Sequence, residues 1–457
     1  MLKRKTLQTL FDWKAQDQKK PLIIRGARQV GKSTLVTELG NSYKNFVMLN
    51  LERSAHAKFF TEYGDDVKQI INAIELEFNV DLLKGDALLF IDEIQEVPLA
   101  ISLLRYFHED TTSLDVIAAG SLLEFALEDV QSFPVGRVQQ IPLYPLDFEE
   151  FLTALNEDKA LVLYNTIPIP EYAHPKLLML FQEYTLIGGM PEIVSAYVTN
   201  GKQLNQLNKI YSSIWDNYRD DIEKYGNNSN EKKVLNHVIS TAPNIRDRIT
   251  FNGFGSSNYG SREVSEAFRK LQKAGIIKLI YPTTDLVAPI IANLKRKPKI
   301  QFLDTGLLNY ASNIQLELMS VKDLNNLYRG YIINHVIFQE LIAMSDRLYD
   351  VPFFWTREST TANAEVDAVV QFQNFVIPIE IKSGPKGSLK SLHEFIERCD
   401  HIYAFRLLAN TFSIEKSVTR SGKEFILANL PYYSIGKIHE WINYVIQNQK
   451  LLPNGKE

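Results

Sequence analysis

The sequence contains one cysteine, Cys399, among 457 residues. A single cysteine cannot form an internal disulfide, and it cannot supply a cysteine-rich metal cluster. The chain also has no apolar run long enough to cross a bilayer, and its polar start, MLKRKTLQTLFDWKAQDQKK, has no apolar signal-peptide core. We therefore expect a cytoplasmic protein without a membrane partner.

Histidine clusters, short-period repeats and long low-complexity tracts are lacking as well. The histidines are scattered, and none has a partner at the spacing of metal ligands. The formal net charge is −4, with 45% hydrophobic and 23% charged residues, which is typical of a folded chain. The length suggests about three domains.

A phosphate-binding loop is predicted near the start of the chain. Residues 21–34 read PLIIRGARQVGKST, so a short apolar strand leads into Gly-x-x-x-x-Gly-Lys-Ser. Two glycines let the backbone N–H groups point at phosphate oxygens, Lys32 can reach the outer phosphates and Ser33 can hold Mg²⁺. The residues predicted to contact ATP are Gly26, Ala27, Arg28, Gln29, Val30, Gly31, Lys32, Ser33 and Thr34.

Two adjacent carboxylates follow a second apolar strand in ALLFIDEIQ, residues 87–95. In a nucleotide hydrolase the first acid orders the magnesium shell and the second polarises the attacking water. We therefore expect Asp92 to help bind Mg²⁺ and Glu93 to act in catalysis together with Lys32. The alternative is an exposed acidic turn after a core strand.

A third apolar strand, LDVIAAGS, ends at Ser121, which either reads the terminal phosphate or caps a helix. The segments GARQVGKS, FIDEIQ, AAGSLLEFA, VGRVQQIPLYPLDFEEF and GGMPEIV together resemble a bacterial and archaeal branch of the AAA+ ATPases, which carries its ATPase in front of a nuclease-like domain. The resemblance implies that Ser121 is a polar sensor. It also implies that Arg137 contacts the terminal phosphate, in cis or from a neighbouring subunit of a homo-oligomer, and a surface ion pair is the alternative for Arg137.

The sequence pattern along the chain predicts an α/β protein of four segments. Residues 1–145 alternate strands and helices, as expected of a P-loop AAA+ core with a parallel sheet. Residues 146–226 are helical and aromatic, as in a helical lid. Residues 227–299 predict a basic winged helix, and residues 300–457 a nuclease-like α/β domain of the restriction-endonuclease type.

The winged-helix segment carries a local positive charge. Residues 246–299 contain eleven Lys or Arg and four acids, a balance of +7. Such a patch in an acidic chain fits the phosphate backbone of DNA, and a solvated face or a domain contact is the alternative. The cations on the second helix and the wing are Arg262, Arg269, Lys270, Lys273, Lys295, Arg296, Lys297 and Lys299.

A second chemical motif lies in AEVDAVVQFQNFVIPIEIKSG. One strand bears Asp367 and the next bears Glu380 and Lys382, which alternation places on one face. Two carboxylates can hold a divalent metal ion that activates water, and a lysine can stabilise the developing oxyanion. The pattern resembles the PD-(D/E)XK nuclease superfamily.

This resemblance implies a metal site of Glu340, Asp367 and Glu380, with Glu340 on the preceding helix. Relatives place a further acid earlier on that helix, where this chain has Asn334. Two functions follow. The first is an ATP-driven enzyme that binds DNA and cleaves it with Mg²⁺. The second is a nucleotide-gated switch that binds DNA or protein and whose nuclease-like domain is an inactive scaffold.

Overall fold

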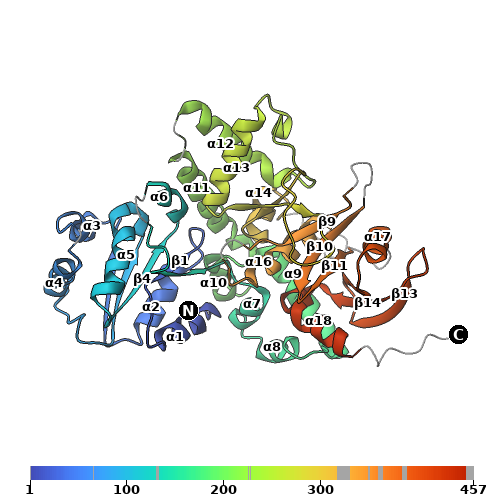
Figure 1. The fold of residues 1–457 in the computed structure, drawn as a ribbon, viewed down its shortest axis with the longest axis horizontal. Coiled ribbons are helices and arrows are strands. Elements are labelled where there is room, and N and C mark those ends of the chain that lie inside the picture. The colour runs from blue at the N-terminus through green and yellow to red at the C-terminus, as the bar shows by residue number, and fades with distance from the viewer. Residues whose placement is uncertain are drawn as a thin grey trace. The chain divides into compact units, whose positions relative to one another are not determined.

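The computed structural model describes residues 2–64, 66–129, 133–224, 226, 228–315, 330–347, 350–358, 364–382 and 389–448 (Figure 1). The described residues form two compact units. The first consists mainly of Met1–Tyr144 and includes the later segment Lys270–Ile276. The second comprises Pro145–Arg269, Ile277–Ser345 and Asp350–Glu457. No helix in these ranges is both long and apolar enough to span a membrane.

A parallel sheet of five strands forms the centre of the first unit. Its order is β2-β3-β4-β1-β5, and all pairings between neighbours are parallel. The strands are β1 (Leu22–Arg25), β2 (Asn45–Asn50), β3 (Ala87–Asp92), β4 (Leu114–Gly120) and β5 (Gln139–Pro142). Strands β1, β3 and β4 are buried along their whole length, as continuous apolar runs predict for a sheet covered on both faces. This confirms the expected α/β core.

Helices connect these strands and cover the sheet. They are α1 (Thr6–Lys14), α2 (Lys32–Gly40), α3 (Ser54–Thr61), α4 (Val67–Phe78), α5 (Pro98–Asp110) and α6 (Leu123–Asp129). Apolar residues of α4 and α5 pack against strands β2, β3 and β4 in one core. Because β4 lies between β1 and β3, the carboxyl ends of these three strands meet at one edge, which is where open α/β sheets bind ligands.

The second unit begins with helices and a small antiparallel pair. Its helices up to residue 273 are α7 (Phe148–Ala154), α8 (Asp158–Tyr164), α9 (His174–Ile187), α10 (Pro191–Thr199), α11 (Asn208–Lys224), α12 (Ser229–Thr241) and α13 (Ser261–Lys273), of which the last four residues group with the first unit. Strand β6 (Ile277–Ile280) then pairs with β8 (Lys299–Phe302), and α14 (Thr305–Ala311) follows.

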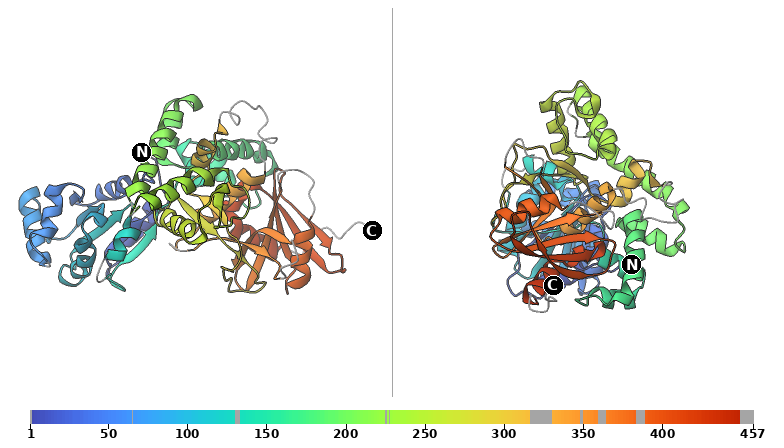
Figure 2. Two further views of the ribbon diagram at one scale, coloured as in Figure 1. Left: turned by 90° about the horizontal axis from the view of Figure 1, so that it is seen from above. Right: turned by 90° about the vertical axis from the view of Figure 1, so that its right-hand side faces the viewer.

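A mixed sheet of seven strands carries the second motif. Its order is β13-β14-β12-β11-β10-β9-β7. Its strands after residue 350 are drawn in orange and red in the two views of Figure 2. The strands are β7 (Pro282–Thr283), β9 (Phe353–Thr356), β10 (Glu365–Phe372), β11 (Phe375–Ile381), β12 (Tyr403–Leu408), β13 (Ser413–Val418) and β14 (Glu424–Pro431). Apolar residues of α17 (Lys390–Arg398) cover one face of it. Helices α16 (Gly330–Ala343) and α18 (Ile438–Gln447) complete the unit.

Most residues of the three segments that we predicted as domains, 146–226, 227–299 and 300–457, fall in this unit, whereas Lys270–Ile276 and Asp346–Tyr349 group with the first unit. The buried Asp304 carboxylate caps α14 through the Leu307 amide and accepts a hydrogen bond of 2.6 Å from the Gly189 amide. A Cβ at Gly189 would lie 2.0 Å from the Leu146 carbonyl oxygen, so glycine is required there. The GGMPEIV segment is thus a packing junction between the helical segment and the C-terminal segment.

Candidate functional site

The predicted phosphate-binding loop joins the end of β1 to the start of α2. Gln29 and Gly31 have positive φ values of 63° and 96°, which turn the backbone tightly before α2 begins at Lys32. A Cβ at Gly26 would lie 2.3 Å from the Leu143 carbonyl oxygen. The loop therefore has the glycine-dependent cradle and the helix N-terminus that suit a phosphate group.

Lys32 lies inside this loop. Its Nζ donates to the carbonyl oxygens of Gly26 and Ala27, at 3.0 and 2.9 Å. Burial lowers the pKa of Lys32 to about 8, although the nearby carboxylates of Glu93 and Asp92 oppose this effect. The ammonium group is thus held by weak acceptors in the loop that a phosphate would occupy, and phosphate oxygens can replace them.

Ser33 and Asp92 provide adjacent oxygen atoms for a cation. The Ser33 hydroxyl donates to Asp92 Oδ2 at 2.7 Å, which connects the loop to the end of β3. Asp92 is buried, and burial raises the pKa of its carboxyl group while the hydrogen bond from Ser33 opposes the increase. A hydroxyl and a carboxylate are hard ligands that suit Mg²⁺ next to bound phosphates.

Glu93 adopts a positive φ of 50°, which turns its side chain toward the end of β4. Its Oε2 accepts hydrogen bonds from the Ser121 hydroxyl and amide, at 3.2 and 3.3 Å, and from Gln95 Nε2 at 2.7 Å. The structure thus brings Glu93 and Ser121 together at the edge that carries the loop. The contact of Gln95 with Glu93 was not predicted from the sequence, although Gln95 lies in the FIDEIQ segment.

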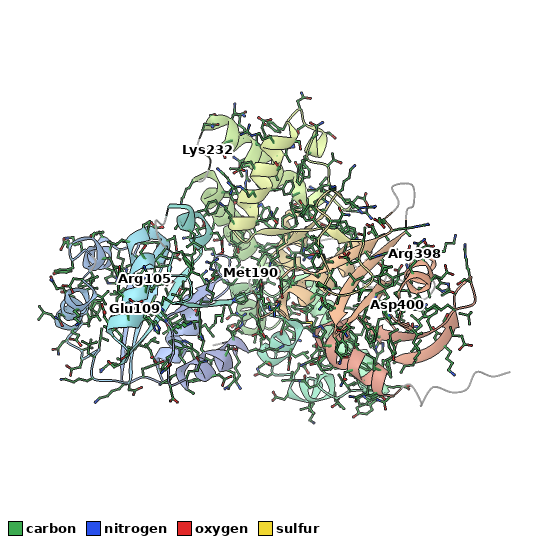
Figure 3. All side chains as sticks on the ribbon, in the orientation of Figure 1. Arg105, Glu109, Met190, Lys232, Arg398 and Asp400 are labelled. Carbon is green, nitrogen blue, oxygen red and sulfur yellow. The ribbon has the colours of Figure 1, made fainter. Side chains whose placement is uncertain are left out.

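Arg137 is placed away from this edge. It precedes β5, and the pairing of Gln139 with Leu22 puts it beside the start of β1, whereas the loop follows the end of β1. Arg137 is half exposed and forms an ion pair of 2.8 Å with Glu109 of α5, which Figure 3 labels. The predicted contact in cis between Arg137 and a phosphate bound to the loop is therefore wrong. The alternative, a surface ion pair, is observed.

The second motif is assembled on the hairpin of β10 and β11. Ala368 pairs with Ile379, so Asp367 and Glu380 are opposite each other with their side chains on one face. Asp367 Oδ2 accepts a hydrogen bond of 2.8 Å from the Ile381 amide, and Lys382 Nζ forms an ion pair with Glu380 Oε1. The structure therefore brings Asp367, Glu380 and Lys382 together as the alternation predicts.

The electrostatics of this hairpin favour a cation. Burial raises the pKa of Glu380 to about 7, and the charge of Asp367 contributes to the increase. Burial also raises the pKa of Asp367. The buried Glu380 Oε2 has no hydrogen-bond partner among the described residues, so the pair can accept a metal ion there.

Glu340 does not belong to this group. Its Oε1 accepts hydrogen bonds from the Tyr184 hydroxyl at 2.7 Å and from the Phe148 amide at 3.1 Å. Asn334 and Phe338 of α16 line a cavity beside Asp367, whereas Glu340 lies on another face of the helix. The predicted metal-binding role of Glu340 is therefore wrong. Among the described residues, no group of three or more His, Cys, Asp or Glu is arranged to hold a metal ion.

We expect Glu340→Ala to lower the free energy of unfolding of the second unit by about 1–3 kcal/mol, because it leaves the buried Phe148 amide without an acceptor and removes one of the two acceptors of the Tyr184 hydroxyl. Denaturant unfolding followed by circular dichroism would measure this loss. The matched control is Glu171→Ala, since Glu171 is exposed. If Glu340→Ala were as stable as the control and impaired metal binding, the metal role would be restored.

The cations of the predicted winged helix are in different environments. Lys270 is only 8% exposed, and its contact with DNA stays a prediction. Arg269 pairs with Glu266 on the same helix, and Lys299 pairs with Glu365. Lys297 and Lys299 line the cavity beside Asp367. Part of the positive charge predicted for the wing, that of Lys297 and Lys299, thus lies beside Asp367 of the second motif.

Three protein-family models match successive parts of the chain. Residues 18–152 match an AAA domain, residues 178–318 match a domain of unknown function (DUF8612), and residues 329–433 match another (DUF4143). The last two matches assign no activity, so the predicted nuclease chemistry has no support from them. The AAA match includes the loop, the acidic strand end and Ser121.

One curated relative is an uncharacterized protein of Haemophilus influenzae, 27% identical over 200 residues. The match covers 42% of this chain and 44% of that protein, less than half of the relative's length.

Two solved structures are similar at a low level. The Walker-type ATPase paby2304 of Pyrococcus abyssi is 13% identical, with a TM-score of 0.45 over 68% of this chain and 96% of that one. PCH-2 of C. elegans is 17% identical, with a TM-score of 0.26 over 39% of this chain and 53% of that one. These scores are too low to support a shared fold. The family match and the motifs in its range show instead that the chain carries an AAA-type P-loop ATPase domain, a class that binds and hydrolyses nucleotide.

Proposed function

We propose that the first unit hydrolyses ATP with Mg²⁺, and that the nucleotide state controls DNA binding and metal-dependent DNA cleavage by the second unit. The observation that carries the ATPase assignment is the hydrogen bond between Ser33 and Asp92, which joins the phosphate-binding loop to the acidic strand end. This bond supports the proposal, because the two side chains that we expect to hold Mg²⁺ are adjacent.

The side chains at this edge have complementary roles. Lys32 binds the outer phosphates, while Ser33 and Asp92 hold Mg²⁺, which neutralises phosphate charge when bound. Glu93 accepts a proton from, and orients, the attacking water. Its contact with Ser121 holds its carboxylate near the position of the terminal phosphate, and the Ser121 hydroxyl can then donate to that phosphate.

The role of Lys32 gives a direct test of the nucleotide site. We expect Lys32→Ala to weaken ATP binding by at least about 100-fold, because it removes a buried charge-assisted contact. Titration with a fluorescent ATP analogue would measure the affinity. Lys58→Ala is the control, because Lys58 is exposed on α3. Equal affinity in the Lys32 variant and wild type would refute the assignment of the loop.

The proposed cleavage uses the hairpin of the second unit. Asp367 and Glu380 would hold the divalent metal ion, which activates a water molecule when bound. Lys382, which now pairs with Glu380, would stabilise the negative charge that develops on the phosphodiester. The cations Lys297 and Lys299 in the adjoining cavity support contact with a phosphate backbone.

A second candidate is the nucleotide-gated switch with an inactive scaffold. The placement of Glu340 favours it, because the helix contributes Asn334 rather than a carboxylate to the cavity beside Asp367. The hairpin then holds two carboxylates where a metal site with a helix acid would have three. Cleavage activity separates the two candidates.

Metal binding at the hairpin should depend on pH. The pKa of Glu380 is about 7, so its carboxyl group is largely protonated at pH 6 and ionised at pH 8. Because Mg²⁺ or Mn²⁺ binds the ionised form, we expect affinity to rise from pH 6 to pH 8, by up to about tenfold per unit below the pKa. Calorimetric titration with Mn²⁺ would measure this.

The control for the pH experiment is Glu380→Gln, which removes the titrating group. The calorimetric comparison uses the Lys32→Ala and Asp92→Ala background, in which the nucleotide site cannot contribute. A rise with pH that persists in Glu380→Gln would assign the pH dependence to another group.

A further inference from the structure

A cavity of about 590 Å³ lies next to Asp367 in the second unit. Its wall comes from five parts of the chain: residues 245–248 after α12, the end of β6, residues around β8, one face of α16 and the start of β10. The volume falls within the range of about 300–1,000 Å³ that is typical of small-molecule sites. The cavity therefore has room for a ligand rather than for a few water molecules alone.

Four cationic side chains line this cavity: Arg246, Arg248, Lys297 and Lys299. Arg248 and Lys299 both form ion pairs with Glu365. In the part of the chain that the structure describes, Arg246 and Lys297 form no ion pair. These two side chains are available to bind an anion, and phosphate is the anion that suits an arginine and a lysine together.

Two residues of α16 that line the cavity each carry a buried polar atom with no hydrogen-bond partner among the described residues. These atoms are the Tyr331 hydroxyl oxygen and Asn334 Oδ1. Burial raises the pKa of Tyr331 to about 12, so the hydroxyl stays protonated at neutral pH and can donate. Buried polar groups without partners are unfavourable, so a ligand with hydroxyl, amide or phosphate groups would supply the missing partners.

A double helix does not fit inside the cavity. A cube of this volume has an edge of about 8 Å, which is less than the width of about 12 Å of the major groove alone. A nucleotide of a single strand needs much less space, and its phosphate, sugar and base match the charged and uncharged groups in the wall.

We propose that this cavity binds a nucleotide at the end of a single nucleic-acid strand. Arg246 and Lys297 bind its phosphate, and Tyr331 and Asn334 bind its sugar or base. The inference rests on the proposed function and deepens it, because Asp367 in the cavity wall then places the strand next to the hairpin that would cut it. The preferred substrate is a single-stranded end rather than a continuous duplex.

Fluorescence anisotropy would test this with the full chain in EDTA, so that the result does not depend on cleavage. The probes are a labelled single-stranded oligonucleotide and a labelled hairpin duplex with closed ends. We expect the single strand to bind at least about tenfold more tightly. We also expect Lys297→Ala to weaken its binding by about tenfold and to reduce the salt dependence by about one phosphate contact.

The variants separate the cavity from the surface around it. We expect Tyr331→Phe, which removes one hydroxyl group, to weaken binding by about threefold to tenfold. We expect a smaller loss for Lys295→Ala than for Lys297→Ala, because Lys295 is exposed and outside the cavity wall. Lys233→Ala on α12 is the control for the change in net charge and should bind as wild type does. Equal losses for Lys295→Ala and Lys297→Ala would overturn the cavity assignment.

Two further outcomes would overturn the proposal. The first is equal affinity for the single strand and the closed duplex. The second is that free thymidine monophosphate displaces the labelled oligonucleotide at the same concentration as the unlabelled oligonucleotide does. The latter would make a free nucleotide the occupant. Cavity-dependent binding without cleavage in Mg²⁺ or Mn²⁺ would support this proposal and reject the nuclease. DNA cleavage together with unchanged binding in Lys297→Ala and Tyr331→Phe would support the nuclease and reject this proposal.

Discussion

Glu93→Gln is expected to reduce ATP hydrolysis by about 100-fold to 10,000-fold while ATP still binds with nearly the affinity of wild type. We propose this carboxylate as the base that accepts a proton from the attacking water, and general base catalysis contributes a factor of this size. Glutamine keeps the shape of the side chain and its carbonyl oxygen can still accept from Ser121, but it cannot take up a proton.

Phosphate release and equilibrium binding of a fluorescent ATP analogue would measure the two parts of this result separately. The matched control is Glu96→Gln, because Glu96 lies three residues after Glu93 and is exposed. It should hydrolyse ATP at the rate of wild type. Full turnover in Glu93→Gln would remove Glu93 from its role, and loss of binding would show that the side chain acts mainly in shaping the site.

Asp367→Asn and Lys382→Ala are each expected to reduce DNA cleavage by about 1,000-fold or more, if the hairpin is a nuclease site. Asparagine loses the negative charge that attracts the metal ion, and alanine removes the cation next to the developing oxyanion. Glu380 remains in both variants, so residual metal binding does not imply residual cleavage. ATP hydrolysis by the first unit should stay at the level of wild type.

The assay would compare duplex, single-stranded and branched DNA with Mg²⁺ or Mn²⁺, in the presence and absence of ATP. Asp400→Asn, an exposed change of the same kind, is the control. Metal-dependent cleavage that both variants lose would establish the nuclease, and its dependence on ATP would show that the two sites are coupled. A wild-type protein that hydrolyses ATP and leaves all substrates intact would support the switch.

Both chemical motifs could be recognised in the sequence because each is local. In the loop, a strand, a turn of fixed length and a helix lie within fourteen residues, and backbone geometry alone brings Gly26, Lys32 and Ser33 together. In the hairpin, strand alternation places Glu380 and Lys382 on one face, and pairing with β10 adds Asp367. Short spacing leaves few alternative arrangements.

Predictions that depended on packing across long stretches of sequence were less successful. Glu340 is an acid on the predicted helix. Its carboxylate, however, accepts hydrogen bonds from Tyr184 and Phe148, which are more than 150 residues away in sequence. Arg137 belongs to a segment whose resemblance implied a phosphate contact. The parallel pairing of β5 with β1 instead places Arg137 beside the start of β1.

The sequence by itself therefore determined which chemical groups this protein carries: a P-loop with its two acids, a basic segment, and a hairpin with two carboxylates and a lysine. Only the tertiary structure decided which of these groups meet. It joined Glu93 to Ser121, separated Glu340 from the hairpin, and formed a cavity from segments between residues 245 and 367. The physical reason is that backbone geometry sets spacing within one element, whereas the burial of apolar faces sets which distant elements are neighbours.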